Sequence, residues 1–484
     1  MAPAEVIPAL RSPASPASVT HGPAGNVAEL TSLLWTRDLP REHGFEPLSI
    51  EGTLPAELAG TLYRNGPGQF GQFGKRYSHP FEADGALTAI RIENGRAFSA
   101  SKVTRSAGLV EERGAGKLLY GASAPWHRRI ANSLRGKQKN TANTSVMVWQ
   151  GRVLALMEAG KPIEIAPSDL ATIGETDLGA VKTTFSAHPH RVASRNAIYN
   201  FGLQYGKQTL LHLYELPDVG RARHLGAVPL PGAPMLHDFI ATDTHLVFFL
   251  SPVRVNVPRM LLQLGSFEQL FQWKPELGTE IICVPIDRPN EPVRFTTDAF
   301  YQWHFANACS DGNKLVVDYV RHPTFDTFRA IGAYAHGGHR NALREGRYHR
   351  ATIDLATRTM TDRCLLDRTC EFPTVARGLE GRAHATSYLV LDDLGGIAAL
   401  SPDTGALDAH VLSSSQRASE PLFVARRGAT SETDGHVLTL CADGPTERAF
   451  VGVYDARHIA AGPVAKVWLD HHVPITFHGT FAPA

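Results

Sequence analysis

From about Pro47 onward, apolar and polar positions alternate over short runs that are separated by turn residues. Such runs include SVMVWQGRVLALME, HLVFFLSP, KLVVDYV and AFVGVYD. Period-two alternation with many β-branched and aromatic residues predicts strands that bury one face. Long helical patterns are nearly absent, so an alternating strand–helix scaffold is disfavoured and an all-β fold is expected.

The turns between these runs carry residues that accept a positive φ. We predict hairpin turns at residues 93–95 (Glu-Asn-Gly), 311–313 (Asp-Gly-Asn) and 433–435 (Thr-Asp-Gly). Strands spread evenly over the chain, with loops longer than sandwich turns, suit radial repetition of four-stranded sheets. Such a propeller brings loops from distant parts of the sequence to one central axis.

Two segments interrupt the strand pattern. Residues 116–139 mix apolar and basic side chains, and residues 253–273 place Met260, Leu264 and Phe267 on what would be one face of a helix, which Phe271 extends. Two interpretations remain open. The apolar faces pack on the domain, or they form a lid or access route for an apolar substrate that also touches lipid.

Composition narrows the classes of partner. The 484 residues carry 48 Lys and Arg against 47 Asp and Glu, so no global positive charge favours nucleic acid, and none is expected as a partner. Five cysteines without a C-x-x-C pair indicate neither a disulfide framework nor a zinc ribbon, and reduced cytosolic thiols are expected.

The N-terminal stretch is rich in Ala and Pro and lacks the apolar core of a secretory signal. We therefore expect residues 1–28 to form a disordered tail. No window reaches the roughly 20 apolar residues that a membrane-spanning helix needs. A cytoplasmic protein is expected, at most peripheral to a membrane.

Histidines are the candidate chemistry of this chain, which has 22 of them. Four lie beside apolar or aromatic residues in or next to expected strands: His188 in FSAHPH, His237 in MLHDF, His304 in QWHFANA and His478 in TFHGTF. They are too far apart for a local metal finger, but one histidine per blade could meet on a propeller axis. Imidazole suits zinc, copper, iron and nickel, so the residue type leaves the metal open.

These phrases belong to a wider set, in order along the chain: GTLYRNGPG, HPFEADGALTAIRIENGRA, NTANTSVMVWQGRVLALMEAGKP, FSAHPH, LHDFIATDTHLVFF, WHFANACSDGNKLVVDYV, EFPTV, EPLFVAR and FHGTF. In this set the sequence resembles the carotenoid cleavage oxygenase family, over roughly residues 48–481. The resemblance implies a seven-bladed β-propeller with a helical cap over one face. It also implies one non-haem Fe(II) per chain on the axis, bound by His188, His237, His304 and His478, with His190 as a neighbour rather than a ligand.

On this resemblance, we expect residues 29–484 to form a single propeller domain, with cap insertions near residues 110–140 and 253–275. Its 253–273 segment also resembles the membrane-facing patch of family members that use lipid-dissolved substrates. A peripheral contact with a membrane is therefore expected through residues 253–273. No obligate protein partner is evident.

The resemblance also assigns supporting residues. Glu158 in LALMEAG, Glu371 in EFPTV and Glu420 in SEPLF match carboxylates that accept the second N–H of ligating histidines. Such acceptors fix the histidine tautomer and strengthen the ligand. Thr144 in NTANT matches a small residue that limits access to one of the two remaining iron positions.

The implied reaction is the cleavage of a conjugated C=C bond by O₂ to two carbonyl products, in which the protein positions the substrate and excludes water. Stilbene-cleaving members grip a phenol with a Tyr and a Lys. This sequence has Val103 and Met157 at the matching positions. We therefore expect an apolar polyene, a carotenoid or apocarotenoid, as substrate. The alternatives are a stilbene- or phenylpropene-cleaving oxygenase and a retinoid isomerase-like member.

Overall fold

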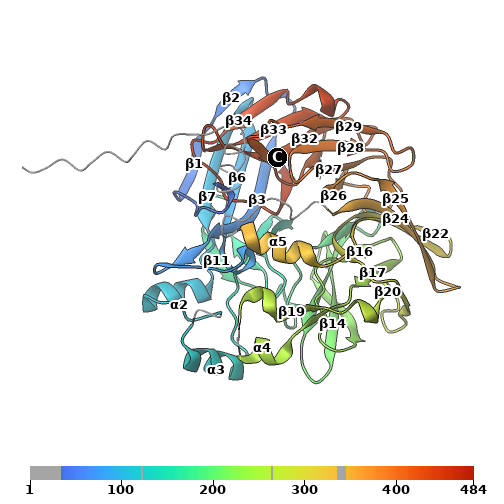
Figure 1. Ribbon diagram of the computed structural model, residues 1–484. Helices are drawn as coiled ribbons and strands as arrows, with labels where there is room; N and C mark the ends of the chain where they lie inside the picture. Colours follow the sequence, from blue (N-terminus) through green and yellow to red (C-terminus); the bar gives the residue numbers. More distant parts are fainter. Residues whose placement is uncertain (1–33, 122–123, 263–264, 335–344) are drawn as a thin grey trace, which may run out of the picture.

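The computed structural model describes residues 34–121, 124–262, 265–334 and 345–484. Within these residues, seven antiparallel sheets of four to six strands lie around a common centre (Figure 1). The fold is therefore the expected all-β, seven-bladed propeller with few helices. The expected disordered tail, residues 1–28, lies outside the described residues.

Five blades are formed by four strands each, and in all five the strands follow chain order across the sheet. The strands are β8 (Ser145–Trp149), β9 (Arg152–Leu156), β10 (Ile163–Ile165) and β11 (Thr172–Glu175); β12 (His190–Val192), β13 (Ala197–Gln204), β14 (Thr209–Pro217) and β15 (Arg223–Leu230); β16 (Ile240–Ala241), β17 (His245–Leu250), β20 (Thr279–Pro285) and β21 (Val293–Thr297); β22 (Tyr301–Asp311), β23 (Lys314–His322), β24 (Arg347–Asp354) and β25 (Thr359–Leu366); β26 (Cys370–Val375), β27 (Ser387–Leu391), β28 (Gly396–Leu400) and β29 (Leu407–Val411).

The remaining two blades combine strands from both ends of the described chain. One has the order β1–β7–β6–β3–β35, and the other has β2–β34–β33–β32 with β30 and β31 both paired to β32. Their bounds are β1 (His43–Pro47), β2 (Ser49–Gly52), β3 (Gly60–Gln69), β6 (Asp84–Glu93), β7 (Arg96–Val103), β30 (Gln416–Ala418), β31 (Leu422–Ala425), β32 (Gly435–Asp443), β33 (Arg448–Asp455), β34 (Ala465–Trp468) and β35 (His478–Pro483). The β3–β35 and β2–β34 pairs close the ring.

The hydrophobic core lies between neighbouring blades, where the inward faces of alternating strands meet. Phe201 of β13 contacts Phe248 of β17 with ring centroids 5.7 Å apart, and Phe249 contacts Tyr319 of β23 at 5.2 Å. All four side chains are buried. The period-two pattern of the sequence is thus the pattern of blade-to-blade packing.

The helices lie on loops between strands rather than in the blades. They are α2 (Ala107–Ala115), α3 (Trp126–Leu134), α4 (Val257–Leu262) and α5 (Asp326–Tyr334), and α5 is drawn across the middle of the ring in Figure 1. None of the helices that the structure describes is long and apolar enough to cross a bilayer. Helices α3 and α4 contact each other.

The single helix expected over residues 253–273 is wrong. The segment folds as β18 (Val253–Val255), α4, a 3₁₀ turn at Phe267–Leu270 and β19 (Phe271–Trp273), which pairs with β18. Gly265 takes a φ of 82°, which an α-helix cannot continue through. Phe267 and Phe271 pack on Phe328 of α5, so the apolar spacing reflects packing rather than one helix face.

Two of the three predicted turns are tight hairpins. Asn94 and Gly95 take φ values of 51° and 70° between β6 and β7, and Gly312 takes 58° between β22 and β23. The turn expected at residues 433–435 is wrong, because residues 426–434 form a longer connection between β31 and β32.

Candidate metal centre

Four histidines from four blades meet at the centre of the ring. His188 and His237 precede β12 and β16, His304 lies on β22, and His478 begins β35. Neighbouring inner strands contact one another, which carries these positions to the axis. The ring centroid of His188 lies 4.2 Å from that of His237, 5.3 Å from that of His304 and 4.7 Å from that of His478. All four side chains are buried.

Three carboxylates face the outer nitrogens of these rings. His304 Nδ1 donates to Glu371 Oε2 at 2.5 Å, and His478 Nδ1 donates to Glu420 Oε1 at 2.8 Å. His237 Nδ1 lies 2.8 Å from Glu158 Oε1. A ring that donates through Nδ1 keeps a lone pair on Nε2, the form that a metal ligand needs.

The residues present fit a divalent metal ion. The Nε2 atoms of His188 and His304 are buried and have no hydrogen-bond partner among the described residues. Ligand atoms of His188, His304 and His478 lie within 4.8 Å of one another, and so do those of Glu158, His188 and His237. Buried nitrogens that converge without partners cost free energy unless an ion satisfies them.

Electrostatics around the rings favour a neutral His188 and ionised carboxylates. Burial and the neighbouring histidines hold the pKa of His188 well below its ordinary value, which keeps its imidazole neutral. Burial alone would raise the pKa of Glu371, but His304 and His322 hold it below the ordinary value. Burial would also raise the pKa of Glu420, and His478 and Arg64 hold it down. The carboxylates therefore remain charged beside a cation.

Two residues that the sequence did not single out support the carboxylates from outside. Arg64, in the GTLYRNGPG phrase, is buried and donates through Nη1 to Glu420 Oε2 at 2.9 Å. His322, at the end of β23, lies with Nε2 3.0 Å from Glu371 Oε1. The phrase around Arg64 could have indicated it, whereas nothing in YVRHP marks His322.

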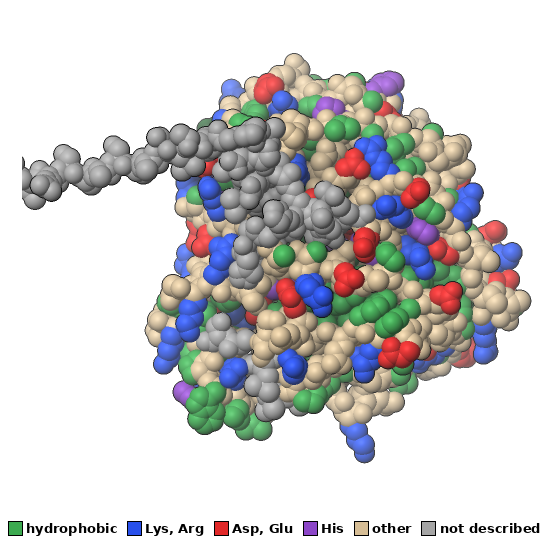
Figure 2. All heavy atoms as spheres, in the orientation of Figure 1, with side chains coloured by type: hydrophobic (Ala, Val, Ile, Leu, Met, Phe, Trp, Pro, Cys, Tyr) green, Lys and Arg blue, Asp and Glu red, His purple; other side chains and the backbone are tan. Residues whose placement is uncertain are grey.

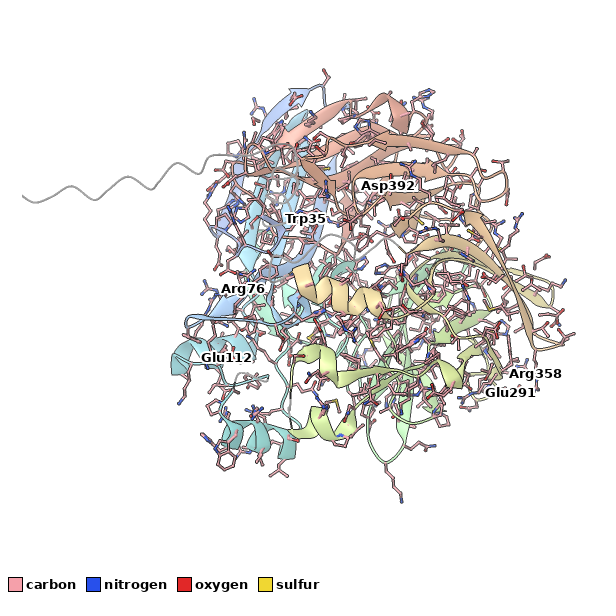
Figure 3. The ribbon with its side chains drawn as sticks, viewed as in Figure 1. Trp35, Arg76, Glu112, Glu291, Arg358 and Asp392 are labelled. Carbon is pink, nitrogen blue, oxygen red and sulfur yellow. The ribbon has the colours of Figure 1, made fainter. Side chains whose placement is uncertain are left out.

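An apolar cavity borders the histidines. His237, His304, His478, Glu371 and Thr144 lie on its wall, and the remainder of the lining is mainly apolar: Trp35, Thr36, Pro80, Phe81, Trp303, Ile331, Phe372, Leu394, Ile475 and Phe477. In Figure 3, Trp35 lies nearer the centre of the ring than Glu112 of α2. A lining of this kind, with a few polar groups among aromatic and aliphatic side chains, suits an apolar ligand.

Two walls of the cavity come from residues in the left-handed backbone region. Phe372 has a φ of 50° and stacks on His304 with centroids 5.0 Å apart. Leu394 has a φ of 67° and follows Asp392 and Asp393, which are also left-handed at 51° and 55°. Such conformations cost free energy in residues other than glycine and recur at functional sites. Here they direct two apolar side chains at the cavity.

Thr144 lies beside the histidines, whereas His190 does not. Thr144 lines the cavity, and its Oγ1 donates to Glu158 Oε2 at 3.4 Å. His190 is outside the histidine cluster: its Nε2 lies 2.8 Å from Asp238 Oδ1, and Asp238 also accepts the backbone N–H of Phe239 and of Phe305. His190 thus joins neighbouring blades.

Val103 and Met157, at the positions where stilbene-cleaving members carry a Tyr and a Lys, are not on the wall of this cavity. Val103 packs with Ala86 and Leu109, and Met157 Sδ accepts the backbone N–H of Thr141 at 3.1 Å. Both side chains are used in packing between β7, α2 and the 139–144 segment rather than facing the histidines.

Fold and site together define a β-propeller with a cluster of four histidines that fits a metal ion, beside an apolar cavity. Residues 37–483 match the model of the retinal pigment epithelial membrane protein family. The chain belongs to this family.

Relatives of the chain are similar over nearly their whole length. It is 31% identical to apocarotenoid-15,15'-oxygenase of Synechocystis over 92% of this chain and 94% of that relative. It is 25% identical to isoeugenol monooxygenase of Pseudomonas nitroreducens over 90% and 94%. A solved structure of the Synechocystis apocarotenoid oxygenase, a Glu-to-Gln variant, superposes with a TM-score of 0.86 at 30% identity and covers 94% of this chain and 99% of its own. A cobalt-substituted form of the same enzyme gives a TM-score of 0.85, also at 30% identity, over the same shares of the two chains.

Proposed function

We propose that this protein is an Fe(II) dioxygenase that cleaves a conjugated C=C bond of a carotenoid or apocarotenoid. The observation that carries the proposal is the meeting of an apolar cavity with the four-histidine centre. His188, His237, His304 and His478 would hold the iron, which supplies activation of O₂ for insertion into the double bond. Both oxygen atoms then reside in two carbonyl products.

The residues of the chain position the reactants and exclude water. Glu158, Glu371 and Glu420 orient three of the histidines and balance the charge of a divalent ion with neutral ligands. Phe81, Trp303 and other aromatic side chains make flat walls along which a planar polyene can lie. Thr144, at the wall beside Glu158, would restrict one of the two positions on the metal that the histidines leave.

The side chains that line the cavity indicate the class of substrate. The described lining holds no Lys, Arg or Tyr that could pair with a phenol. A phenol buried there would lose its hydrogen bonds with water and would meet a mainly apolar wall without a Lys, Arg or Tyr partner. The apolar lining therefore favours a polyene over a hydroxystilbene, in agreement with the relative named for apocarotenoids.

The test is aerobic incubation of the Fe(II)-loaded protein with carotenoids, apocarotenals, isoeugenol and hydroxystilbenes, with product masses read after reaction under ¹⁸O₂. We expect apocarotenals to react fastest and each carbonyl product to carry label when solvent exchange is quenched. Faster turnover of isoeugenol or a stilbene would replace the substrate class. Conversion without O₂ would indicate an isomerase.

A second candidate, cleavage of a phenylpropene or stilbene, has support in two relatives. These are isoeugenol monooxygenase and the lignostilbene-α,β-dioxygenase isozyme III of Sphingomonas paucimobilis, which is 26% identical over 93% of this chain. The unpaired phenol argues against it for this cavity.

We also propose contact with a membrane through the outer face of α3. Trp126, Ile130 and Leu134 stand four residues apart on one helical face and are 68%, 40% and 84% exposed. Figure 2 shows apolar side chains gathered at the edge of the molecule where Figure 1 draws α3. Arg135, which is exposed at the C-terminal end of α3, would attract anionic lipid. In the 253–273 segment, the aromatic residues Phe267 and Phe271 are instead packed inward.

A further inference from the structure

His322 is a buried histidine that directly contacts a carboxylate of the metal centre. It is the last residue of β23, is 0% exposed, and lies with Nε2 3.0 Å from Glu371 Oε1. Because Glu371 is held ionised and can only accept, His322 Nε2 carries the proton and donates. The other ring nitrogen of His322, Nδ1, is buried with no partner among the described residues.

Glu371 is saturated by donors from three different places in the fold. Oε2 accepts His304 Nδ1 at 2.5 Å and the backbone N–H of Phe372 at 2.7 Å, and Oε1 accepts His322. The first two donors contact one oxygen, and His322 contacts the other. The contact from His322 therefore holds the carboxylate from the side opposite His304.

The backbone makes room for this contact. A Cβ atom on Gly346 would lie 2.9 Å from Cε1 of the His322 ring, closer than side-chain carbons approach. Gly346 precedes β24, the neighbour of β23 in the same blade. The imidazole is thereby seated against the strand with its Nε2 directed at Glu371.

The three carboxylates differ in this outer support. Glu420 has a corresponding donor, Arg64, on its second oxygen, together with the backbone N–H of Gly479. Glu158 receives a longer contact, 3.4 Å from Thr144 Oγ1, and its side chain is 30% exposed. Glu371 and Glu420 therefore each have a buried side-chain donor, His322 or Arg64, behind them. Glu158, the partner of His237, has the longer Thr144 contact instead.

We propose that His322 is a positioning residue of the metal centre: by donating to Glu371 Oε1 it fixes the carboxylate that orients His304. It touches neither substrate nor metal, and it acts through Glu371. The inference rests on the proposed metal centre. Substitution of such outer partners commonly weakens metal binding about 10- to 100-fold.

The experiment uses Co(II) as a spectroscopic probe in the full chain. A His322→Gln variant can place its amide N–H near the position of Nε2, whereas His322→Asn has the same chemistry but falls short of Glu371. His436→Asn is the control, because His436 is also buried and paired with a glutamate, Glu57, away from the centre. Chelator competition gives the Co(II) dissociation constant, and the visible ligand-field bands report the geometry of the bound ion.

We expect His322→Asn to weaken Co(II) binding about 10-fold or more and to change the ligand-field bands. His322→Gln and His436→Asn should bind Co(II) close to the unchanged chain with the same bands. Equal affinity and bands in His322→Asn and His322→Gln would overturn the positioning role, whatever happens to thermal stability. Failure of the unchanged chain to bind Co(II) would instead overturn the metal centre itself.

Discussion

Two histidines separated by one proline, His188 and His190, have different surroundings in this protein. The first turns a partnerless Nε2 into the cluster, and the second pairs with Asp238. Sequence could separate them only through the resemblance of the whole phrase, because both lie in the same apolar run. The difference is one of position: His188 precedes β12, whereas His190 is its first residue and pairs with Asp238 of the neighbouring blade.

We predict that His188→Ala loses bound iron and activity, because it removes one ligand from the ring. His190→Ala should keep its iron and lose stability by about 1–3 kcal/mol, since it leaves the buried Asp238 short of one donor. Metal analysis of both purified variants, with urea unfolding as the second measurement, checks this. Equal iron loss in the two variants would contradict the assignment.

Among the elements, the 139–144 segment lies between helix α3 and strand β8, and it places Thr144 on the wall of the cavity. Lys139 Nζ lies 2.8 Å from Asp84 of β6 and 2.7 Å from Glu112 of α2, and all three side chains are buried. Burial raises the pKa of Asp84 above its ordinary value, and Lys139 opposes that rise. The segment is therefore held by a charge cluster in which Lys139 is the cation that contacts both buried carboxylates.

Lys139→Met should destabilise the protein by about 3–5 kcal/mol, because two buried carboxylates lose their partner. Without Lys139 the folded-state pKa of Asp84 rises further, so the folded state binds a proton more tightly than the unfolded state. The deficit should then shrink as pH falls from about 8 to about 5.5. Urea unfolding at both pH values measures it.

The matched control is Arg37→Met, which breaks the exposed pair with Glu447 and should cost no more than about 1 kcal/mol at either pH. A Lys139→Met deficit that grows on acidification would contradict the role of Asp84.

Variants in helix α3 and in the 3₁₀ turn at Phe267 separate the two interpretations of the apolar segments, which are contact with lipid and packing on the domain. Trp126→Ser with Leu134→Ser should weaken binding to anionic liposomes while leaving the melting temperature nearly unchanged, since both side chains are exposed. Phe267→Ser should instead lower stability, because Phe267 packs on His79, Phe271 and Phe328. Liposome co-sedimentation and thermal unfolding give the two readouts. Unaltered liposome binding by the α3 variant would contradict membrane contact through that helix.

For the whole molecule, the sequence indicates strands well and the cap poorly. Alternation of apolar and polar residues predicts the strands because every blade buries its apolar faces against its neighbours. The phrases that resemble the family predict the four histidines at the axis. The apolar spacing of residues 253–273 is misleading because Gly265 breaks the helix and the aromatic residues pack on α5. The cavity wall was not predictable, since Trp35, Phe81 and Leu394 come from loops far apart in the chain.

Metal binding should stabilise the whole propeller, because the histidines come from four blades. Any ion that binds only the folded state adds free energy, about 2.7 kcal/mol at a concentration 100 times its dissociation constant. We expect chelation to lower the melting temperature and Fe(II) or Co(II) to restore it. His478→Ala should abolish the metal-dependent shift. A shift that persists in this variant would show that the ion binds elsewhere.

The pairing of β3 with β35 also sets an order of events during folding. The ring closes only when segments some four hundred residues apart meet, and contacts so distant in sequence form slowly. His478 is the first residue of β35 and lies opposite Asn65 of β3 in that pair. The fourth histidine therefore reaches the axis at the moment of closure, together with Ile475 and Phe477 of the cavity wall, so the last ligand of the proposed metal site and the last part of its apolar surroundings arrive in one step.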